Sequence, residues 1–136
     1  VQTCALPILA ERLGAPIDDS KVTIGGGLDD FMHQLCDGLG ATLRAPLVVR
    51  VGARGAWIRE PGGETIHIEG YPTKAVHTRS AGGCHTGVMC AMLAKGHSLA
   101  ESVKIANAAA SIAIQHSLNG VPQCPDYDEA IALIGE

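Results

Sequence analysis

Aromatic side chains are scarce in this chain of 136 residues: they make up 3% of it, as Phe31, Trp57, Tyr71 and Tyr127. A core must therefore be built from aliphatic side chains. With 46% hydrophobic and 18% charged residues, the composition excludes a disordered or fibrous chain. A chain of this length forms one domain or part of one, and a domain of this size buries roughly two thirds of its unfolded surface. We expect a soluble α/β protein.

Several other features are missing. No run of Lys or Arg is present and the net charge is -4, so nucleic acid is not an expected partner. No segment reaches the about 20 apolar residues of a membrane helix, and no charged leader opens the sequence, so no membrane partner is expected. The five cysteines contain no CxxC pair, which excludes a disulfide framework or a zinc knuckle and favours the reducing cytoplasm.

The first eight residues, VQTCALPI, are the translation of a common sequencing-adapter DNA. We expect residues 1–8 to be an artefact, and residues 9–136 to be part of a longer domain. The alternative is a short apolar N-terminal segment that matches the adapter by chance.

The first half of the sequence alternates helix and strand signals. A helix is predicted to end at Gly14, and a short strand to run from Lys21 to Ile24. Apolar residues at near-helical spacing predict an amphipathic helix that starts near Leu28 and ends at Gly38 or Gly40. A buried strand, PLVVRVG, follows. The segments GAWIRE and ETIHIEG flank PGG and predict a hairpin, and YPTKAVHT is expected to be extended.

The second half is mostly helical. One helix is predicted from about Gly83 to Lys95, closed by Gly96. Ser98 and Glu101 form the capping box of a second helix, which runs to about His116 and is buried over a wide face. In PDYDEA, an aspartate cap starts a short terminal helix.

The stretch HTRSAGGCHTG, from His77 to Gly87, resembles an anion-binding turn. Small residues that open a helix let an anion approach unpaired N–H groups, and the helix dipole favours negative charge there. These residues are Ser80, Ala81, Gly82 and Gly83. A plain tight turn into a helix is the alternative.

Four segments in order resemble the PfkB or ribokinase-like carbohydrate kinases. The family signature D-T-x-G-A-G-D is matched at Thr78, Ala81 and Gly82. The segment A-N-A-A-A, Ala106 to Ala110, resembles the core of the family's helix pair, and VPQCP its proline-containing exit. The segment VVRVGARGAWI is similar to the strand and turn before the signature. The resemblance implies the C-terminal half of a three-layer α/β/α sandwich.

The resemblance also implies an activity: transfer of the γ-phosphoryl group of ATP, with Mg²⁺, to a sugar or nucleoside hydroxyl. The loop amides would form the anion hole at Ser80–Gly83. The adenine would lie near the turn that contains Gly52 and Gly55, and near Asn107. The last Asp of the signature would take the proton from the attacking hydroxyl. The parent protein could be a homodimer.

The chain departs from the signature where the chemistry should occur. The position of the family's catalytic Asp is Gly83, the first Asp is His77 and the first Gly is Ser80. Losing general-base assistance costs about 10² to 10⁴ in rate, so we expect this chain to be inactive by itself. His85 is expected to be a sugar-side or packing residue. The Asn-x-x-Glu motif that helps to organise Mg²⁺ is not found.

Three explanations remain open. In the first, the parent gene encodes an active kinase and sequence errors removed the carboxylate, since each departure needs one base change. In the second, a degenerate homologue binds nucleotide or sugar without turnover. In the third, His77, Cys84 and His85 form a metal site, because zinc accepts these ligand types.

The missing half of the domain has a consequence for solubility. Half of a layered sheet exposes apolar surface that the other half would cover, so this chain is expected to be poorly soluble by itself.

Overall fold

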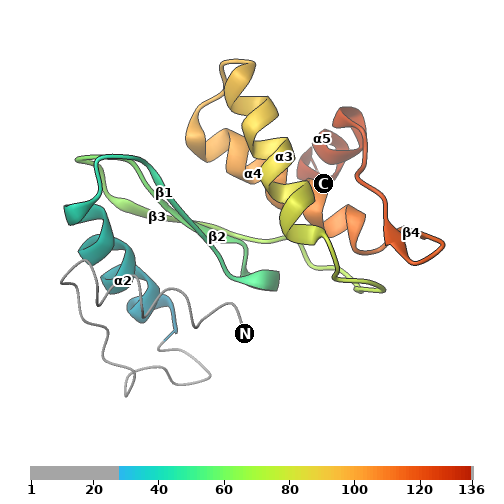
Figure 1. Ribbon diagram of the computed structural model, residues 1–136, viewed down its shortest axis with the longest axis horizontal. Helices are drawn as coiled ribbons and strands as arrows, with labels where there is room; N and C mark the ends of the chain where they lie inside the picture. Colours follow the sequence, from blue (N-terminus) through green and yellow to red (C-terminus); the bar gives the residue numbers. More distant parts are fainter. Residues whose placement is uncertain (1–27, 136) are drawn as a thin grey trace. The chain divides into compact units, whose positions relative to one another are not determined.

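The computed structural model describes residues 28–135, which divide into two compact units. The first unit contains residues 28–49 and 57–67, and the second contains residues 50–56 and 68–135. Figure 1 shows the described helices and strands in chain order. The predicted helix end at Gly14 and the strand at Lys21–Ile24 lie outside the described residues.

The first unit combines helix α2 (Leu28–Thr42) with most of a three-stranded sheet. The strands are β1 (Leu47–Arg50), β2 (Ala56–Arg59) and β3 (Thr65–Ile68), in the order β1-β2-β3. The turn at residues 60–64 joins β2 to β3, and Gly62 adopts a φ of 74° there. The predicted strand, turn and strand pattern is therefore confirmed.

Helix α2 buries one stripe of side chains: Met32, Leu35, Cys36 and Leu39. Their spacing of three and one places them on one face, which confirms an amphipathic helix. Leu35 and Leu39 belong to the apolar pattern predicted from the sequence, whereas Met32 and Cys36 do not. Within the same unit, Trp57 is fully buried, and its ring stacks on His67 with centroids 3.9 Å apart. The helix continues to Thr42, beyond both glycines that were expected to end it.

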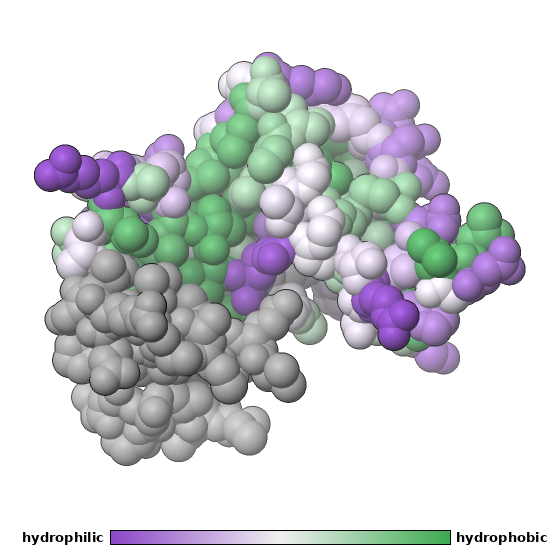
Figure 2. All heavy atoms as spheres, in the orientation of Figure 1, coloured by the Kyte–Doolittle hydropathy of each residue, from purple (hydrophilic) through white to green (hydrophobic). Residues whose placement is uncertain are grey.

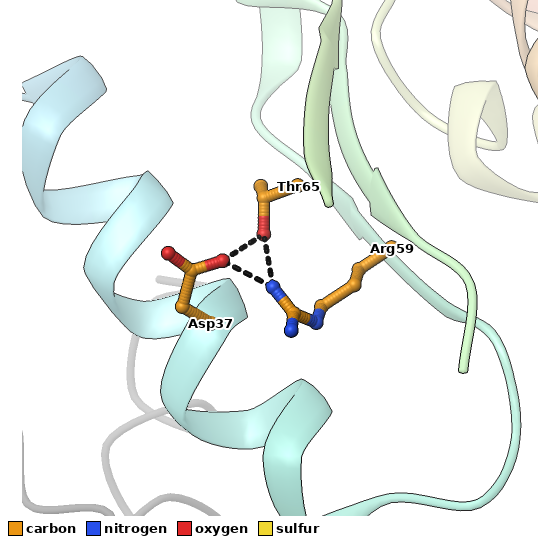
Figure 3. Close-up of polar contacts among 3 residues, drawn as sticks. All are labelled: Asp37, Arg59 and Thr65. Carbon is orange, nitrogen blue, oxygen red and sulfur yellow. Dashed lines mark hydrogen bonds and ion pairs between the residues drawn. The ribbon is translucent and has the colours of Figure 1, made fainter. Parts of the chain in front are cut away.

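A polar cluster joins α2 to the β2–β3 pair (Figure 3). Arg59 on β2 forms an ion pair with Asp37 on α2, and the Thr65 hydroxyl donates to the same carboxylate oxygen at 2.6 Å. The Arg59 side chain is only 20% exposed and crosses the helix beside Gly40. A Cβ atom at Gly40 would collide with Cδ and Nε of Arg59. Gly40 therefore leaves the space in which the guanidinium reaches Asp37.

The second unit holds the remaining helices. After the short 3-10 helix η3 (Gly52–Arg54) come α3 (Ala81–Ala94), α4 (Leu99–Ala113) and α5 (Tyr127–Gly135). The capping box at Ser98 and Glu101 is present, with hydrogen bonds in both directions. Asp126 and Glu129 exchange the same two bonds at the start of α5. Both capping predictions are confirmed.

Helix α4 forms the centre of this unit, because most of its side chains are buried. The core cluster consists of Met92, Ile105, Ala108, Ala109 and Ala130, from α3, α4 and α5. Alanines on α4 allow close approach of the neighbouring helices, which aliphatic side chains then fill. The wide buried face that the sequence predicted is confirmed.

Two expectations about local structure were wrong. PLVVRVG is only partly buried, with Val49 its single buried residue within β1. Cys90, expected to fill the core like other small apolar side chains, is exposed. The segment at residues 71–78, expected to be extended, contains neither helix nor strand. A small antiparallel pair that the sequence did not predict, β4 (Ser117–Leu118) with β5 (Val121–Pro122), follows α4.

Large apolar side chains are exposed in the second unit, including Val76, Leu93, Leu118 and Val121. Figure 2 shows apolar residues on the surface over α3. Such surface favours association, in line with the poor solubility expected for this chain. None of the described helices is both long enough and apolar enough to cross a membrane.

A pair of glycine substitutions tests the cluster at Arg59. Gly87→Ala, in the exposed middle of α3 where a Cβ meets no atom within 4 Å, should stabilise the chain by up to about 1 kcal/mol through helix propensity. Gly40→Ala gains the same propensity but displaces Arg59 from Asp37. We expect it to be less stable than Gly87→Ala by at least about 1 kcal/mol in urea unfolding followed by circular dichroism. Equal stability of the two variants would show that Arg59 moves aside freely.

Candidate functional site

The site begins at the loop that opens α3. Ser80 precedes the helix in a left-handed conformation, with φ 66° and ψ 4°, and its side chain makes no capping hydrogen bond. The first intrahelical bond is that from Cys84 N–H to the Ser80 carbonyl, at 3.0 Å. Among residues 28–135, the N–H groups of Gly82 and Gly83 have no hydrogen-bond partner. Two donors at the positive end of the helix dipole are therefore available to an anion.

Gly83 is exposed, and a Cβ atom there would meet nothing within 4 Å. The position consequently has room for a side chain. A carboxylate at the third residue of a helix is also electrostatically favourable. The backbone thus accommodates the aspartate that the signature has here, although this chain has none.

Arg50, at the end of β1, binds the first turn of α3. Its Nη1 donates to the Gly82 carbonyl and to the Thr86 hydroxyl, the latter at 3.2 Å. Thr86 also donates to the Gly82 carbonyl, at 3.0 Å. A guanidinium group has five donors, and the described bonds use Nη1 alone. Arg50 therefore fixes the turn and places a positive charge against the first turn of α3.

Asn107 on α4 is buried and links three segments of the second unit. Its Nδ2 donates to the carbonyls of Ile68 and Glu69, at 3.1 and 3.0 Å. Its Oδ1 lies 2.8 Å from Nε2 of His85 on α3. The amide is thus satisfied on both sides by the protein itself.

These bonds determine the state of His85. Because Nδ2 of Asn107 faces two carbonyls, Oδ1 must be the acceptor, so Nε2 of His85 carries the proton. Nδ1 of His85 is buried and has no partner among the described residues. Burial lowers the pKa of His85; the bond to Asn107 opposes the shift, and the charge of Arg50 adds to it. His85 is a neutral packing residue, one of the two roles expected for it.

Two glycines bring the turn at residues 52–55 against the segment that Asn107 holds. Gly55 has a φ of 87°, and a Cβ there would overlap the Ile68 carbonyl. A Cβ at Gly70 would overlap the Ala53 carbonyl. Only glycine permits this backbone contact. The turn that contains the predicted nucleotide-binding positions Gly52 and Gly55 therefore packs against residues 68–70. The third predicted position, Asn107, binds the same segment.

The candidate metal ligands His77, Cys84 and His85 do not converge. His85 is bonded to Asn107, and Cys84 contacts Cys124 at 2.7 Å. Within residues 28–135, no three His, Cys, Asp or Glu side chains are grouped so that they could hold a metal ion. Neither the contact of Arg50 with Gly82 nor that of Cys84 with Cys124 was predicted from the sequence.

Comparison with known proteins identifies the family of this chain. The sequence model of the pfkB family carbohydrate kinases matches residues 32–124. The chain belongs to this family. Ser80 has the backbone conformation that glycine adopts without strain, and it occupies the position of a glycine in the pfkB signature.

Two sugar kinases are similar in sequence. The sugar kinase YegV of Escherichia coli is 40% identical over 72 residues, which cover 53% of this chain and 22% of that protein. The 5-dehydro-2-deoxygluconokinase of Listeria monocytogenes is 32% identical over 91 residues, which cover 66% of this chain and 27% of the relative. The chain therefore spans about a quarter of the length of these pfkB relatives.

Solved ribokinases share the fold. The Arabidopsis thaliana ribokinase, complexed with ribose and ATP, has a TM-score of 0.68 at 22% identity, over 93% of this chain and 38% of that one. The Cryptococcus neoformans ribokinase, in complex with ADP, has a TM-score of 0.71 at 20% identity, over 96% of this chain and 41% of that one. The predicted ribokinase-like α/β fold class is confirmed.

Replacing Ser80 tests the left-handed position. Ser80→Gly should stabilise the chain by about 0.5 to 1 kcal/mol, because it removes the strain of a side chain at positive φ. Ser80→Ala should leave the stability nearly unchanged, since the hydroxyl makes no capping bond. Urea unfolding measured by circular dichroism compares the two. A loss of about 1 kcal/mol in Ser80→Ala would instead mean that the hydroxyl caps α3.

His85 should make stability depend on pH. Its pKa is lowered in the folded chain, so the unfolded chain binds the proton more readily. The contribution of His85 to the unfolding free energy is complete above pH 6.5, the ordinary pKa of histidine. It is lost as the pH falls from there towards the lowered pKa of the folded chain. His85→Gln, which keeps a donor for Asn107, should flatten the decline in unfolding free energy between pH 7.5 and 5.5. His116→Gln, at an exposed site, is the control, and an unchanged slope in His85→Gln would contradict the assignment.

Proposed function

We propose that the whole protein, of which residues 9–136 form part of a pfkB kinase domain, transfers the γ-phosphoryl group of ATP to a sugar or nucleoside hydroxyl. Membership of the pfkB family supports this activity. The observation that carries it is the pair of unpaired amides at Gly82 and Gly83, which Arg50 adjoins at the N-terminus of α3. The described residues would supply the nucleotide side of the reaction.

The amides and Arg50 fit the needs of phosphoryl transfer. Negative charge spreads over the oxygens of the transferred group, and fixed donors that point at them stabilise that charge. Amides at a helix N-terminus do so without reorganisation, and Arg50 can bind the same oxygens through its remaining donors. Such a site holds a phosphate group and lowers the barrier, but it removes no proton from the acceptor.

Among the described residues we assign neither a ligand set for Mg²⁺ nor a general base. No group of three or more His, Cys, Asp or Glu side chains that could hold a metal ion occurs in residues 28–135, and no step is assigned to Mg²⁺. We propose that Mg²⁺ enters with ATP, as the name of an Escherichia coli ribokinase II structure, in complex with ATP and Mg²⁺, describes for that protein. His85 cannot replace the missing Asp, because it is buried and its Nε2–H is bound to Asn107.

An active parent kinase is favoured over a degenerate binding protein. The open space at Gly83 would accept an aspartate, and the left-handed backbone at Ser80 would accept a glycine, as the complete signature requires. A loop that had lost its function would be free to lose this strained conformation. The alternative, a homologue that binds nucleotide or sugar without turnover, is favoured by Gly83 itself, which has no group to accept a proton. The codons for residues 77–84 in the source gene distinguish the two, since an Asp codon at position 83 establishes the kinase.

Calorimetric titration of ATP with Mg²⁺ into the chain tests the site. Arg50→Ala should weaken ATP binding about five- to ten-fold, because it removes a charged donor beside the anion site, worth about 1 to 1.4 kcal/mol. Arg44→Ala, an exposed arginine of the other unit, is the matched control and should bind like the wild type.

Equal affinity in the two variants would exclude Arg50 from the nucleotide site. A phosphoryl-transfer assay with ribose accompanies the titration and should show no turnover by this chain. Turnover by this chain, which has Gly83 at the position of the catalytic Asp, would show that the reaction does not require a carboxylate there.

A further inference from the structure

Two cysteines that lie far apart in sequence meet in the second unit. The Sγ atoms of Cys84 and Cys124 are 2.7 Å apart, although the two residues are separated by 40 positions in the sequence. Cys84 lies in the first turns of α3, directly after Gly83, and is partly buried. Cys124 lies between β5 and α5 and is exposed. A disulfide has an S–S distance of about 2.05 Å, so the two atoms need only about 0.7 Å of approach.

Cys124 is also accessible to small molecules. It lines an open cavity of about 360 Å³, together with Ile112, Pro125 and Glu129. This volume is at the lower end of the range of about 300 to 1,000 Å³ that is usual for small-molecule sites. A thiol reagent can therefore reach Cys124 directly, and Cys84 is the less exposed of the two thiols.

We propose that Cys84 and Cys124 are a modification site, at which a low-molecular-weight disulfide such as oxidised glutathione installs an intramolecular cross-link. The Cys124 thiolate attacks one glutathione sulfur, which forms a mixed disulfide and releases the first glutathione as a thiolate. The Cys84 thiolate then attacks the Cys124 sulfur and releases the second glutathione. Two protein thiols are oxidised, one glutathione disulfide is reduced to two thiols, and the two thiol protons pass to the released thiolates.

The surroundings of the two thiols set the order of these steps. Burial raises the pKa of Cys84 to about 12, and the hydrogen bond to Cys124 adds to the rise. A thiol in that state is a poor first nucleophile, because only the thiolate attacks. Cys124, exposed on the cavity wall, reacts first. The mixed disulfide on Cys124 then removes the thiol that holds the Cys84 proton in place.

The cross-link would restrain the segment that carries the candidate anion site. It connects the first turns of α3, which carry the unpaired amides of Gly82 and Gly83, to the chain just before α5. Cross-linking residues this far apart in sequence lowers the entropy of the unfolded chain and so stabilises the fold. The proposal does not depend on the kinase activity, since it concerns only these two thiols.

Peptide mapping by mass spectrometry tests the cross-link. The chain is treated with oxidised glutathione, the free thiols are alkylated, and the chain is digested with trypsin. Cleavage after Arg79, Lys95 and Lys104 places Cys84 in the peptide 80–95 and Cys124 in the peptide 105–136. The expected product is these two peptides joined. Because peptide 80–95 also contains Cys90, the mapping is repeated with Cys90→Ser, in which the same cross-link should form.

The single variants separate the steps. Cys84→Ser should accumulate a glutathione adduct on Cys124, and Cys124→Ser should leave Cys84 unmodified. The oxidised wild type should melt about 5 to 15 °C above the reduced wild type, a shift that Cys84→Ser abolishes. Linkage of Cys124 to Cys4 or Cys90, or oxidation of the wild type to separate adducts without a cross-link, would overturn the proposal.

Discussion

The amide of Asn107 is the interaction on which the candidate site depends. Its two N–H groups satisfy the carbonyls of Ile68 and Glu69, and its oxygen holds His85. Asn107 and His85 are both buried, and a buried polar group left without a partner costs about 1–3 kcal/mol. The network therefore joins the end of β3, α3 and α4 into one arrangement. Asn107 is fully occupied by this network, whereas the amides of Gly82 and Gly83 have no partner among residues 28–135.

The sequence predicts much of this fold because the strongest signals are local. Capping boxes at Ser98 and Asp126 specify helix starts within four residues, and apolar spacing specifies the buried faces of α2 and α4. The match to the pfkB signature also located the loop before α3. Its glycine position proved to be informative even where the glycine is replaced, since Ser80 keeps the left-handed backbone. Local geometry and family pattern agree at that residue for a physical reason.

The rest depends on contacts between segments that no local pattern encodes. Arg50 meets Gly82 and Cys84 meets Cys124 across more than 30 positions of the chain. A single asparagine in an alanine-rich helix gives no indication of which carbonyls it will bind. The pair β4–β5 has strands of two residues each, too short for any alternation to be visible. The extended segment after β3 had strand-like composition, but in the structure it pairs with no other strand.

The stacked pair of Trp57 and His67 has a consequence for how this molecule can be observed. Trp57 is the only tryptophan of the chain, and both rings belong to the first unit. Intrinsic tryptophan emission therefore reports on the environment of one ring in the first unit. The second unit carries the candidate site, and its aromatic chromophores are Tyr71 and Tyr127. Tryptophan and tyrosine fluorescence recorded on one sample would thus follow the two units separately.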